Sequence, residues 1–333
     1  MPSSTVSIFT DPDAYHAAIR DTHAEGVVTG RGDFRAESVA VRLGRVSLQR
    51  GAETLPRTAY TAIDPKVIGA VFTTYPGPEP HVNGLEVSQT DIIVYRAGSE
   101  GYNRIPPACQ WGSIALTHED IAAAGKTIIG RELIAPPVTQ RIKTPAPLLS
   151  RLLNLHEAAG HLAKTAPDIL AKPEVGRAID QALVEAMVAC LASGDPVDER
   201  SAYRHHAKVM RRLEEVVRAN PEGPLHMDDL CRATGVSHRT LIDCCQEHLG
   251  MSPKRYLILR RMHLARQALR AAQSDGTTVT EIATNYGFWE LGRFSVVYRS
   301  LFGESPSTTL RRPPEDPRPR EIAGSLRQFA NFA

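Results

Sequence analysis

Short alternating runs of apolar and polar residues follow one another between about residues 30 and 120. Residues 39–43 place an apolar side chain at every second position, and after Gly44 the alternation resumes at residues 46–48. A period of two predicts a half-buried β-hairpin. Further strand-like runs follow at residues 59–63, 67–75, 84–87, 91–96 and 112–116.

Turn residues separate these runs. They are the PGPEP segment at 76–80, Asn83-Gly84, Gly98-Ser99 and Pro106-Pro107. Gly, Asn and Pro readily adopt the backbone angles that tight turns require. About seven short strands separated by turns indicate a β-sandwich or a β-barrel.

The pattern becomes helical after Pro147. Residues 148–164 and 174–193 are rich in Ala and Leu and have the period of an α-helix. The polar segment SGDPVDER at 193–200 predicts a domain boundary, and a helix at 202–219 then opens the C-terminal part. Acidic residues and Pro12 predict that a short helix within residues 11–20 opens the chain.

One small pattern occurs twice in the last third of the chain. The copies at 227–253 and 278–306 each hold a short amphipathic stretch, a turn with Gly, a longer amphipathic stretch and a final Gly-x-Ser-Pro. In the first copy Gly235 supplies the turn and Ser237 is placed to cap the next helix. The longer helices are predicted to bury Leu241, Cys244, Cys245 and Leu249 in the first copy, and Phe294, Val297, Tyr298 and Leu301 in the second. Each copy therefore predicts a helix-turn-helix unit.

The segment at 253–272 joins the two copies and contains no internal helix breaker after Pro253. Twenty helical residues span about 30 Å, close to the 34–36 Å between major-groove positions one DNA turn apart. We therefore expect a rigid helix that holds two recognition helices over successive major grooves. Its apolar side is predicted to contain Tyr256, Leu257, Leu264, Ala265 and Ala268.

These residues resemble the AraC family of bacterial transcription regulators, whose DNA-binding domain has two helix-turn-helix units joined by one long helix. The matching pieces occur in order and at the family's spacing over roughly the last third of the chain. They are Gly235-Val236-Ser237 with Leu241, Leu249-Gly250-Met251-Ser252-Pro253, Ile282-Ala283, Tyr286-Gly287-Phe288, Phe294-Ser295 and Phe302-Gly303-Glu304-Ser305-Pro306.

The resemblance implies an α+β protein: a cupin-like β-barrel followed by helices, and then an all-α DNA-binding domain. It implies a transcription regulator that binds double-stranded DNA and responds to a small-molecule effector, with activation as the expected effect and repression as the open alternative. RNA polymerase and a second copy of the chain are further expected partners. Helices 148–164 and 174–193 are candidates for the homodimer interface, with the alternative that they only cover the barrel.

On this basis the chain divides into three parts. The boundaries expected are 1–195 for an effector-sensing and dimerisation domain (β-rich at 30–120, helical at 148–193), 200–312 for the DNA-binding domain (helix-turn-helix units at about 225–248 and 276–301), and 313–333 for a disordered tail with a short helix near 322–329. No motif in the first part identifies the effector-binding residues.

The resemblance also assigns candidate DNA-contacting residues to both recognition helices. The base-facing positions are His238, Arg239, Ile242, Asp243 and Gln246 in the first unit, and Leu291, Gly292, Arg293 and Val296 in the second. The expected phosphate contacts are Lys254, Arg255 and Arg299. Trp289 is expected to pack under the second helix rather than to wedge into DNA.

Two positions depart from the family's pattern. Family members often have Arg where this chain has Asp243 and Val296. Base reading should therefore depend mainly on the first unit, in which Arg239 can bind guanine, Asp243 can accept from cytosine N4 and Ile242 can touch a thymine methyl. The alternative for Asp243 is an ion pair that orients Arg239.

Charge is unevenly distributed along the chain. Residues 201–312 hold 17 Lys and Arg against 11 Asp and Glu, whereas residues 1–200 hold 19 against 23. Only the C-terminal part is suited by charge to a polyanion. We expect the acidic N-terminal part not to bind DNA.

The sequence gives little support to an enzyme. The N-terminal histidines are isolated, no cofactor or nucleophile motif occurs, and the five cysteines lack metal-binding spacing, so we expect no metal or cofactor. The alternative kept open is a cupin-type small-molecule enzyme fused to a DNA-binding domain. No apolar run is long enough to span a membrane and no signal segment is evident, so a cytoplasmic protein is expected.

Overall fold

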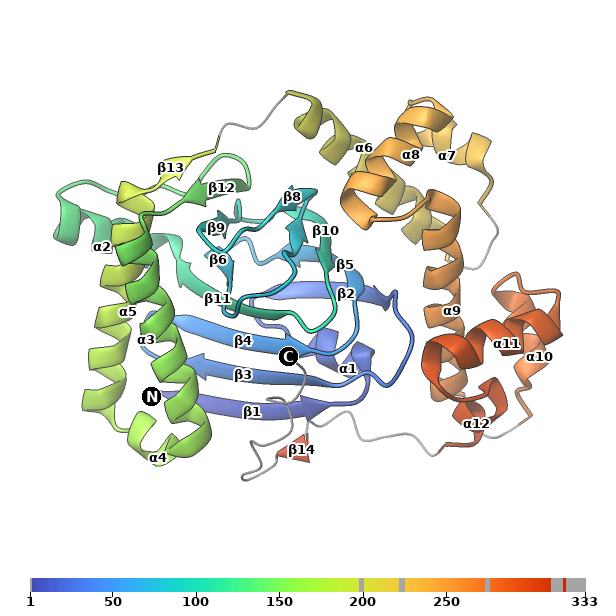
Figure 1. Ribbon diagram of the computed structural model, residues 1–333, viewed down its shortest axis with the longest axis horizontal. Coiled ribbons are helices and arrows are strands. Elements are labelled where there is room, and N and C mark those ends of the chain that lie inside the picture. Colours follow the sequence, from blue (N-terminus) through green and yellow to red (C-terminus); the bar gives the residue numbers. More distant parts are fainter. Residues whose placement is uncertain (1, 198–200, 222–224, 273–275, 313–319, 322–333) are drawn as a thin grey trace.

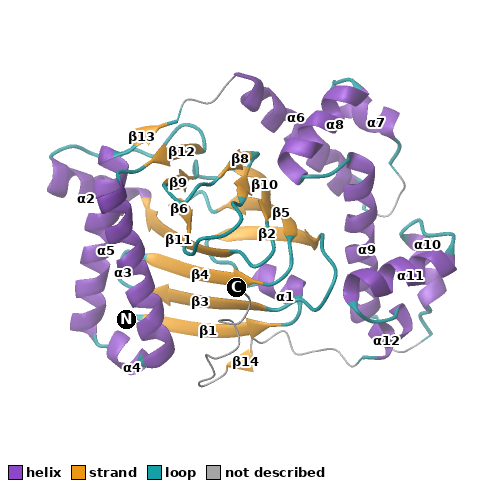
Figure 2. Cartoon of the chain, viewed as in Figure 1, coloured by secondary structure: helices purple, strands orange, loops and turns teal. Residues whose placement is uncertain are grey.

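The computed structural model of the chain describes residues 2–197, 201–221, 225–272, 276–312 and 320–321. Strands fill the middle of the molecule and helices flank them on two sides, as Figure 1 and Figure 2 show. The helices α3 (Ala146–Thr165) and α5 (Pro173–Ser193) lie on one side of the strands, and the C-terminal helices lie on the other.

The described strands form two antiparallel sheets. The larger has the order β13-β12-β9-β6-β11-β4-β3-β1-β14, and the smaller has the order β2-β5-β10-β7-β8. Their bounds are β1 Ser3–Phe9, β2 Thr22–Val28, β3 Ala36–Arg42, β4 Ser47–Glu53, β5 Arg57–Ile63, β6 Val67–Thr73, β7 His81–Val82, β8 Leu85–Glu86, β9 Asp91–Val94, β10 Glu100–Ile105, β11 Gln110–Thr117, β12 Gln140–Lys143, β13 Asp195–Pro196 and β14 Arg320–Glu321.

The hairpin expected around Gly44 is confirmed as β3 and β4, with Val41 opposite Leu48. Its turn is held by Asp180 of α5, whose carboxylate accepts from the backbone N–H groups of Arg45 at 2.8 Å and Val46 at 3.0 Å. The same carboxylate accepts from the Arg45 guanidinium at 2.8 Å. A buried carboxylate needs such partners, so Asp180 fixes α5 to the hairpin.

The Asn83-Gly84 turn is also confirmed. Asn83 has φ 53° and Gly84 has φ 88°, the left-handed angles that a tight two-residue hairpin loop requires. The turn joins the two short strands β7 and β8, where the sequence suggested one strand at 84–87. The hairpin lies at the edge of the smaller sheet.

Helices cover the outer face of the larger sheet. The main core packs α2 (His118–Ile129), α3 and α5 against the sheet through Leu152, Leu183 and Met187, and the four-residue helix α4 (Pro167–Leu170) lies beside them. The helices expected at 148–164 and 174–193 are thus confirmed, and they do cover the sheet. A separate cluster around Tyr15 and Trp111 packs at the inner side of the strands.

Several expectations for the N-terminal part are wrong in detail. Strand β1, not a helix, is the first described element, and the helix α1 (Pro12–Ala17) follows it. The strands β1, β2, β10 and β12 and the helix α2 were not expected. The described strands form two separate sheets, so the expected barrel is open. The α+β class is confirmed.

The C-terminal helices follow the predicted order. They are α6 Ser201–Ala219, α7 Met227–Thr234, α8 His238–Leu249, α9 Pro253–Ala271, α10 Val279–Asn285, α11 Leu291–Phe302 and α12 Pro306–Arg311. In the tail, Ile8 of β1 pairs with Arg320 and Ser7 with Glu321, where no strand was expected. The helix expected near 322–329 lies outside the described residues.

Candidate DNA interface

The first helix-turn-helix unit consists of α7 and α8. Gly235 ends α7 with φ 74°, and Ser237 caps α8 by accepting from the Thr240 N–H at 3.2 Å. The predicted apolar stripe of α8 is confirmed, since all four of its residues are buried: Leu241, Cys244, Cys245 and Leu249. Burial raises the pKa of the Cys244 thiol to about 12, in keeping with a packing role.

The opposite face of α8 is exposed. It carries all five residues assigned to base contacts: His238, Arg239, Ile242, Asp243 and Gln246. Ile242 is 42% exposed, which is high for a large apolar residue. His238 Nε2 lies 2.7 Å from Asp228 Oδ1. No ion pair joins Arg239 to Asp243 among the described contacts, so both side chains are available to a ligand.

The second unit consists of α10 and α11. Thr278 caps α10, Gly287 makes the turn with φ 75°, and Phe294 and Tyr298 of α11 are buried, while Val297 and Leu301 are half-buried. The assigned base-facing residues of α11 are all exposed: Leu291, Gly292, Arg293 and Val296. Val296 is 70% exposed.

The expectation that Trp289 packs under α11 is wrong, because this side chain is 76% exposed. Trp289 and Val296 are both large apolar side chains exposed to water in the second unit. Exposed apolar surface of this kind marks an interaction site. Arg293 lies beside it, 3.8 Å from Glu290. The surface suits contact with thymine methyl groups or with the groove wall.

Helix α9 joins the two units, and Ser252 caps its first turn. Its 19 residues span about 28 Å at the rise of an α-helix. The predicted apolar side is only partly correct: Tyr256 and Ala265 are buried, but Leu257, Leu264 and Ala268 are half-buried. The helix instead buries Leu259, Met262, His263, Arg266 and Leu269, because neighbours cover it on more than one side.

The assigned phosphate contacts are exposed cations. Lys254, Arg255 and Arg299 form no ion pair through their side chains within the described part of the chain. Exposed cations without acidic partners are the side chains that neutralise DNA phosphates. Their role, like that of the base-facing residues, stays a prediction.

The N-terminal part packs directly against α9, which the sequence did not indicate. The Val28 N–H of β2 donates to His263 Nε2 at 3.0 Å. Arg266 NH1 lies 3.1 Å from Asp11 Oδ1 at the start of α1. Burial lowers the pKa of the His263 imidazole to about 3, and the nearby Arg266 adds to this effect, so the ring is neutral.

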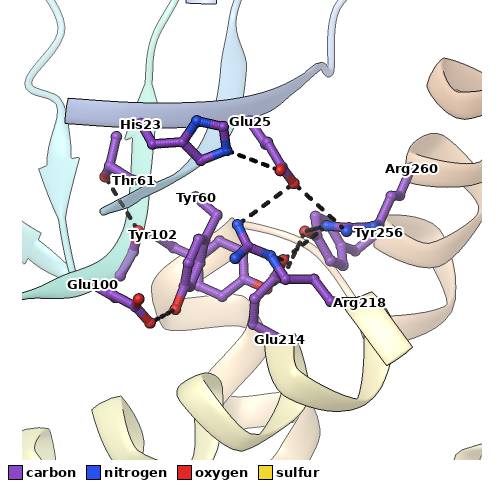
Figure 3. A network of polar contacts seen from close by, with 11 residues as sticks. His23, Glu25, Tyr60, Thr61, Glu100, Tyr102, Glu214, Arg218, Tyr256 and Arg260 are labelled. Carbon is purple, nitrogen blue, oxygen red and sulfur yellow. Dashed lines mark hydrogen bonds and ion pairs between the residues drawn. The ribbon is translucent and has the colours of Figure 1, made fainter. Parts of the chain in front are cut away.

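A buried carboxylate joins the smaller sheet to α6, the helix that packs against the first unit. Glu214 of α6 is 1% exposed. It accepts from the Tyr102 hydroxyl of β10, from Arg218 Nε at 2.9 Å and from Arg260 NH1 of α9 at 3.0 Å. Figure 3 shows these side chains converging from three elements. We call Glu214, Tyr102, Arg218 and Arg260, together with Glu25, the junction network.

Glu25 of β2 is the second carboxylate of the junction network. It lies 3.5 Å from Arg218 and 3.8 Å from Arg260. Burial opposes its ionisation, but His23 and the two arginines outweigh that effect and lower the pKa of Glu25. Each arginine therefore bridges a carboxylate of the sheet and a carboxylate of α6, as the dashed lines in Figure 3 show.

Two cavities lie near the network. One, of about 460 Å³, lies between β2 and α9 and is lined in part by Glu25, Tyr256 and Arg260. The other, of about 100 Å³, lies between the two sheets, with apolar walls that include Phe72 and Val82. Asn103 lines the second cavity, and its Oδ1 atom has no hydrogen-bond partner in the structure.

Within the described ranges, no group of three or more His, Cys, Asp or Glu side chains is arranged to hold a metal ion. The same ranges contain no helix that is both long and apolar enough to cross a membrane.

Comparison with known proteins agrees with this geometry. A family model described as a helix-turn-helix domain matches residues 230–312. The chain is 36% identical over 105 residues to the XylDLEGF operon transcriptional activator of Pseudomonas putida, covering 32% of each protein. It is 37% identical over 136 residues to a probable thc operon regulatory protein of Rhodococcus erythropolis, covering 38% of this chain and 41% of that protein.

A solved structure is also similar to part of this chain. The probable AraC family transcriptional regulator from Rhodopseudomonas palustris is 37% identical, and the match covers 31% of this chain and 95% of that one, with a TM-score of 0.29. The match to the P. putida activator spans about a third of that protein's length. The family model places its match at residues 230–312, in the C-terminal third of the chain.

Proposed function

The chain belongs to the AraC family through its C-terminal domain, and from this premise we propose that the whole protein is a cytoplasmic, sequence-specific regulator of transcription. The proposed division is a sensing and dimerisation part at 1–195 and a DNA-binding domain at 200–312. The names of the relatives are those of regulators, which favours this function over the enzyme alternative.

One observation carries the proposal. The two recognition helices α8 and α11 leave their outer faces exposed at the two ends of one continuous helix, and exposed cations without ion pairs stand beside them. The 19 residues of α9 separate the two units by about 28 Å, close to one turn of DNA, so the recognition helices can enter two successive major grooves on one face of the duplex. Phosphate contacts then fix the register, and base contacts give the sequence preference.

Base reading is assigned mainly to α8. Arg239 can donate two hydrogen bonds to guanine O6 and N7, and Asp243 can accept from cytosine N4. Ile242 can touch a thymine methyl. The assigned face of α11 is largely apolar, so it reads thymine methyls or the shape of the groove.

We place the effector in the cavity between the two sheets. Its walls are mostly apolar, and Asn103 Oδ1 offers an acceptor without a partner. An apolar molecule with one hydrogen-bond donor fits this lining. An effector there acts on DNA binding only if its affinity differs between two arrangements of the domains, and the junction network is the contact that links them.

Two further partners are proposed, a second copy of the chain and RNA polymerase. A homodimer through α3 and α5 would use polar faces, because the described large apolar residues of these two helices are buried or half-buried. RNA polymerase is a proposed partner because the similar protein of P. putida is named as a transcriptional activator.

The test of the proposal is selection of bound fragments from genomic DNA by the full-length protein, followed by affinity measurements on the enriched site. We expect a site with two conserved segments about 10 base pairs apart. Equal affinity for the enriched site and for random DNA would contradict the proposal. Arg131→Ala, at an exposed position just after α2, serves as the control for a lost positive charge.

A further inference from the structure

A groove runs between the loop that joins β2 to β3 and the second recognition helix. It has a volume of about 310 Å³, and its walls include Arg31 of the loop, Arg255 of α9, and Val296 and Ser300 of α11. Val296 belongs to the exposed face assigned to DNA. The groove is therefore continuous with that face.

The base of the loop is fixed to the N-terminal sheets. The Thr29 N–H donates to the Pro56 carbonyl at 2.8 Å, and Thr54 Oγ1 donates to the Asp33 carbonyl at 3.2 Å. Phe34 is buried in the cluster around Tyr15. Since both ends are held, Arg31 is kept beside α11 rather than moving freely.

Arg31 has the properties of a phosphate-binding side chain. It is exposed, and within the described residues its guanidinium makes no ion pair or hydrogen bond. Arg255, across the groove, is exposed in the first turn of α9, where the helix dipole also favours an anion. Two unpaired arginines that face one groove lower the energy of a negative group placed between them.

The position of Arg31 matters because α11 has no cation at Val296, where the AraC family often has Arg. Val296 supplies no charge there, and Arg31 reaches the same surface from another part of the chain. We propose that Arg31 binds a DNA phosphate beside the second recognition helix, so that the acidic N-terminal part takes part in DNA binding through this loop. The inference rests on the proposed function.

Arg31→Ala in the full-length protein tests it through the salt dependence of DNA binding. Loss of one phosphate contact should make the slope of log affinity against log salt less steep by about 0.9, with similar weakening on specific and random DNA. Arg31→Lys should restore most of the slope, because a phosphate accepts either cation. Arg131→Ala removes the same charge just after α2, on the other side of the strands from α11 (Figure 1), and should leave the slope at the wild-type value.

The outcomes separate the two proposals. A wild-type slope in Arg31→Ala would overturn the role of Arg31 while the DNA-binding function stands. Weakening on the specific site alone would also overturn it, since that would indicate a base contact. A wild-type protein that binds no DNA would instead overturn the proposed function itself.

Discussion

Tyr102 of β10 donates a hydrogen bond to Glu214 of α6, the helix that packs against the first helix-turn-helix unit. Both side chains are almost fully buried. Burial raises the pKa of Tyr102, and the neighbouring Tyr256 and Glu214 add to this, so the hydroxyl remains a donor at neutral pH. The contact makes the N-terminal part a fixed neighbour of the DNA-binding helices.

Removal of this hydroxyl should destabilise the junction. Tyr102→Phe leaves the buried Glu214 with one donor fewer, which costs about 1–3 kcal/mol in the free energy of unfolding. The matched change is Tyr60→Phe, which removes a hydrogen bond to the exposed Glu100 and should cost less. Urea unfolding of both variants measures their free energies of unfolding. Equal losses of stability would contradict a stabilising role for the Tyr102–Glu214 hydrogen bond.

The buried His156 makes the free energy of unfolding depend on pH. Burial, with Arg50 nearby, lowers the pKa of His156 to about 3, whereas an unfolded histidine titrates near 6.5. The unfolded state therefore binds one more proton between these values, and stability falls as pH drops from about 6.5 toward 3. His156→Gln should reduce that slope by about 1.4 kcal/mol per pH unit. The exposed His161→Gln should not change it, and an unaltered slope in His156→Gln would show that the ring is protonated in the folded protein.

Base reading by the first unit predicts a sequence-dependent loss. Arg239→Ala should cost about 1–3 kcal/mol on the cognate site and far less on random DNA, because a bidentate contact to guanine exists only on the right sequence. Lys254→Ala should weaken both DNAs alike. Equal weakening of both by Arg239→Ala would make Arg239 a phosphate contact.

The rigidity of α9 can be tested directly. Replacement of Leu264-Ala265 by Gly-Pro should kink the helix, since proline removes a backbone donor and clashes with the preceding turn. Binding to a full site should be lost while a half-site is still bound weakly. Because Ala265 is fully buried, a thermal melt must show that the variant folds. Full-site affinity at the wild-type level would contradict the spacer role.

Local sequence signals predicted the DNA-binding domain well. The cap at Ser237, the turn at Gly235 and the stripe of α8 depend on residues within one helical turn of one another. The exposed faces of both recognition helices followed from the same periodicity. Trp289 was misplaced because its exposure depends on a loop conformation that periodicity does not specify.

Contacts distant in sequence were not predictable in the same way. Glu214 and Arg218 are four residues apart and read as an ordinary pair on a helix surface, yet a strand more than a hundred residues away buries Glu214. The buried side of α9 was only partly predicted because β2 and α1 cover it as well as the DNA-binding helices. Strand β2 and strand β10 contain few apolar residues, so alternation did not reveal them.

The central claim is that α9 holds two recognition helices over successive major grooves. The most direct measurement is the affinity of the full-length protein for its selected site and for the same site with about five base pairs inserted between the conserved segments, a half turn of DNA. The claim predicts that the insertion reduces affinity to that of a single segment, and that insertion of about ten base pairs does not restore it, since α9 has a fixed length. Equal affinity for the original and the half-turn site would contradict it.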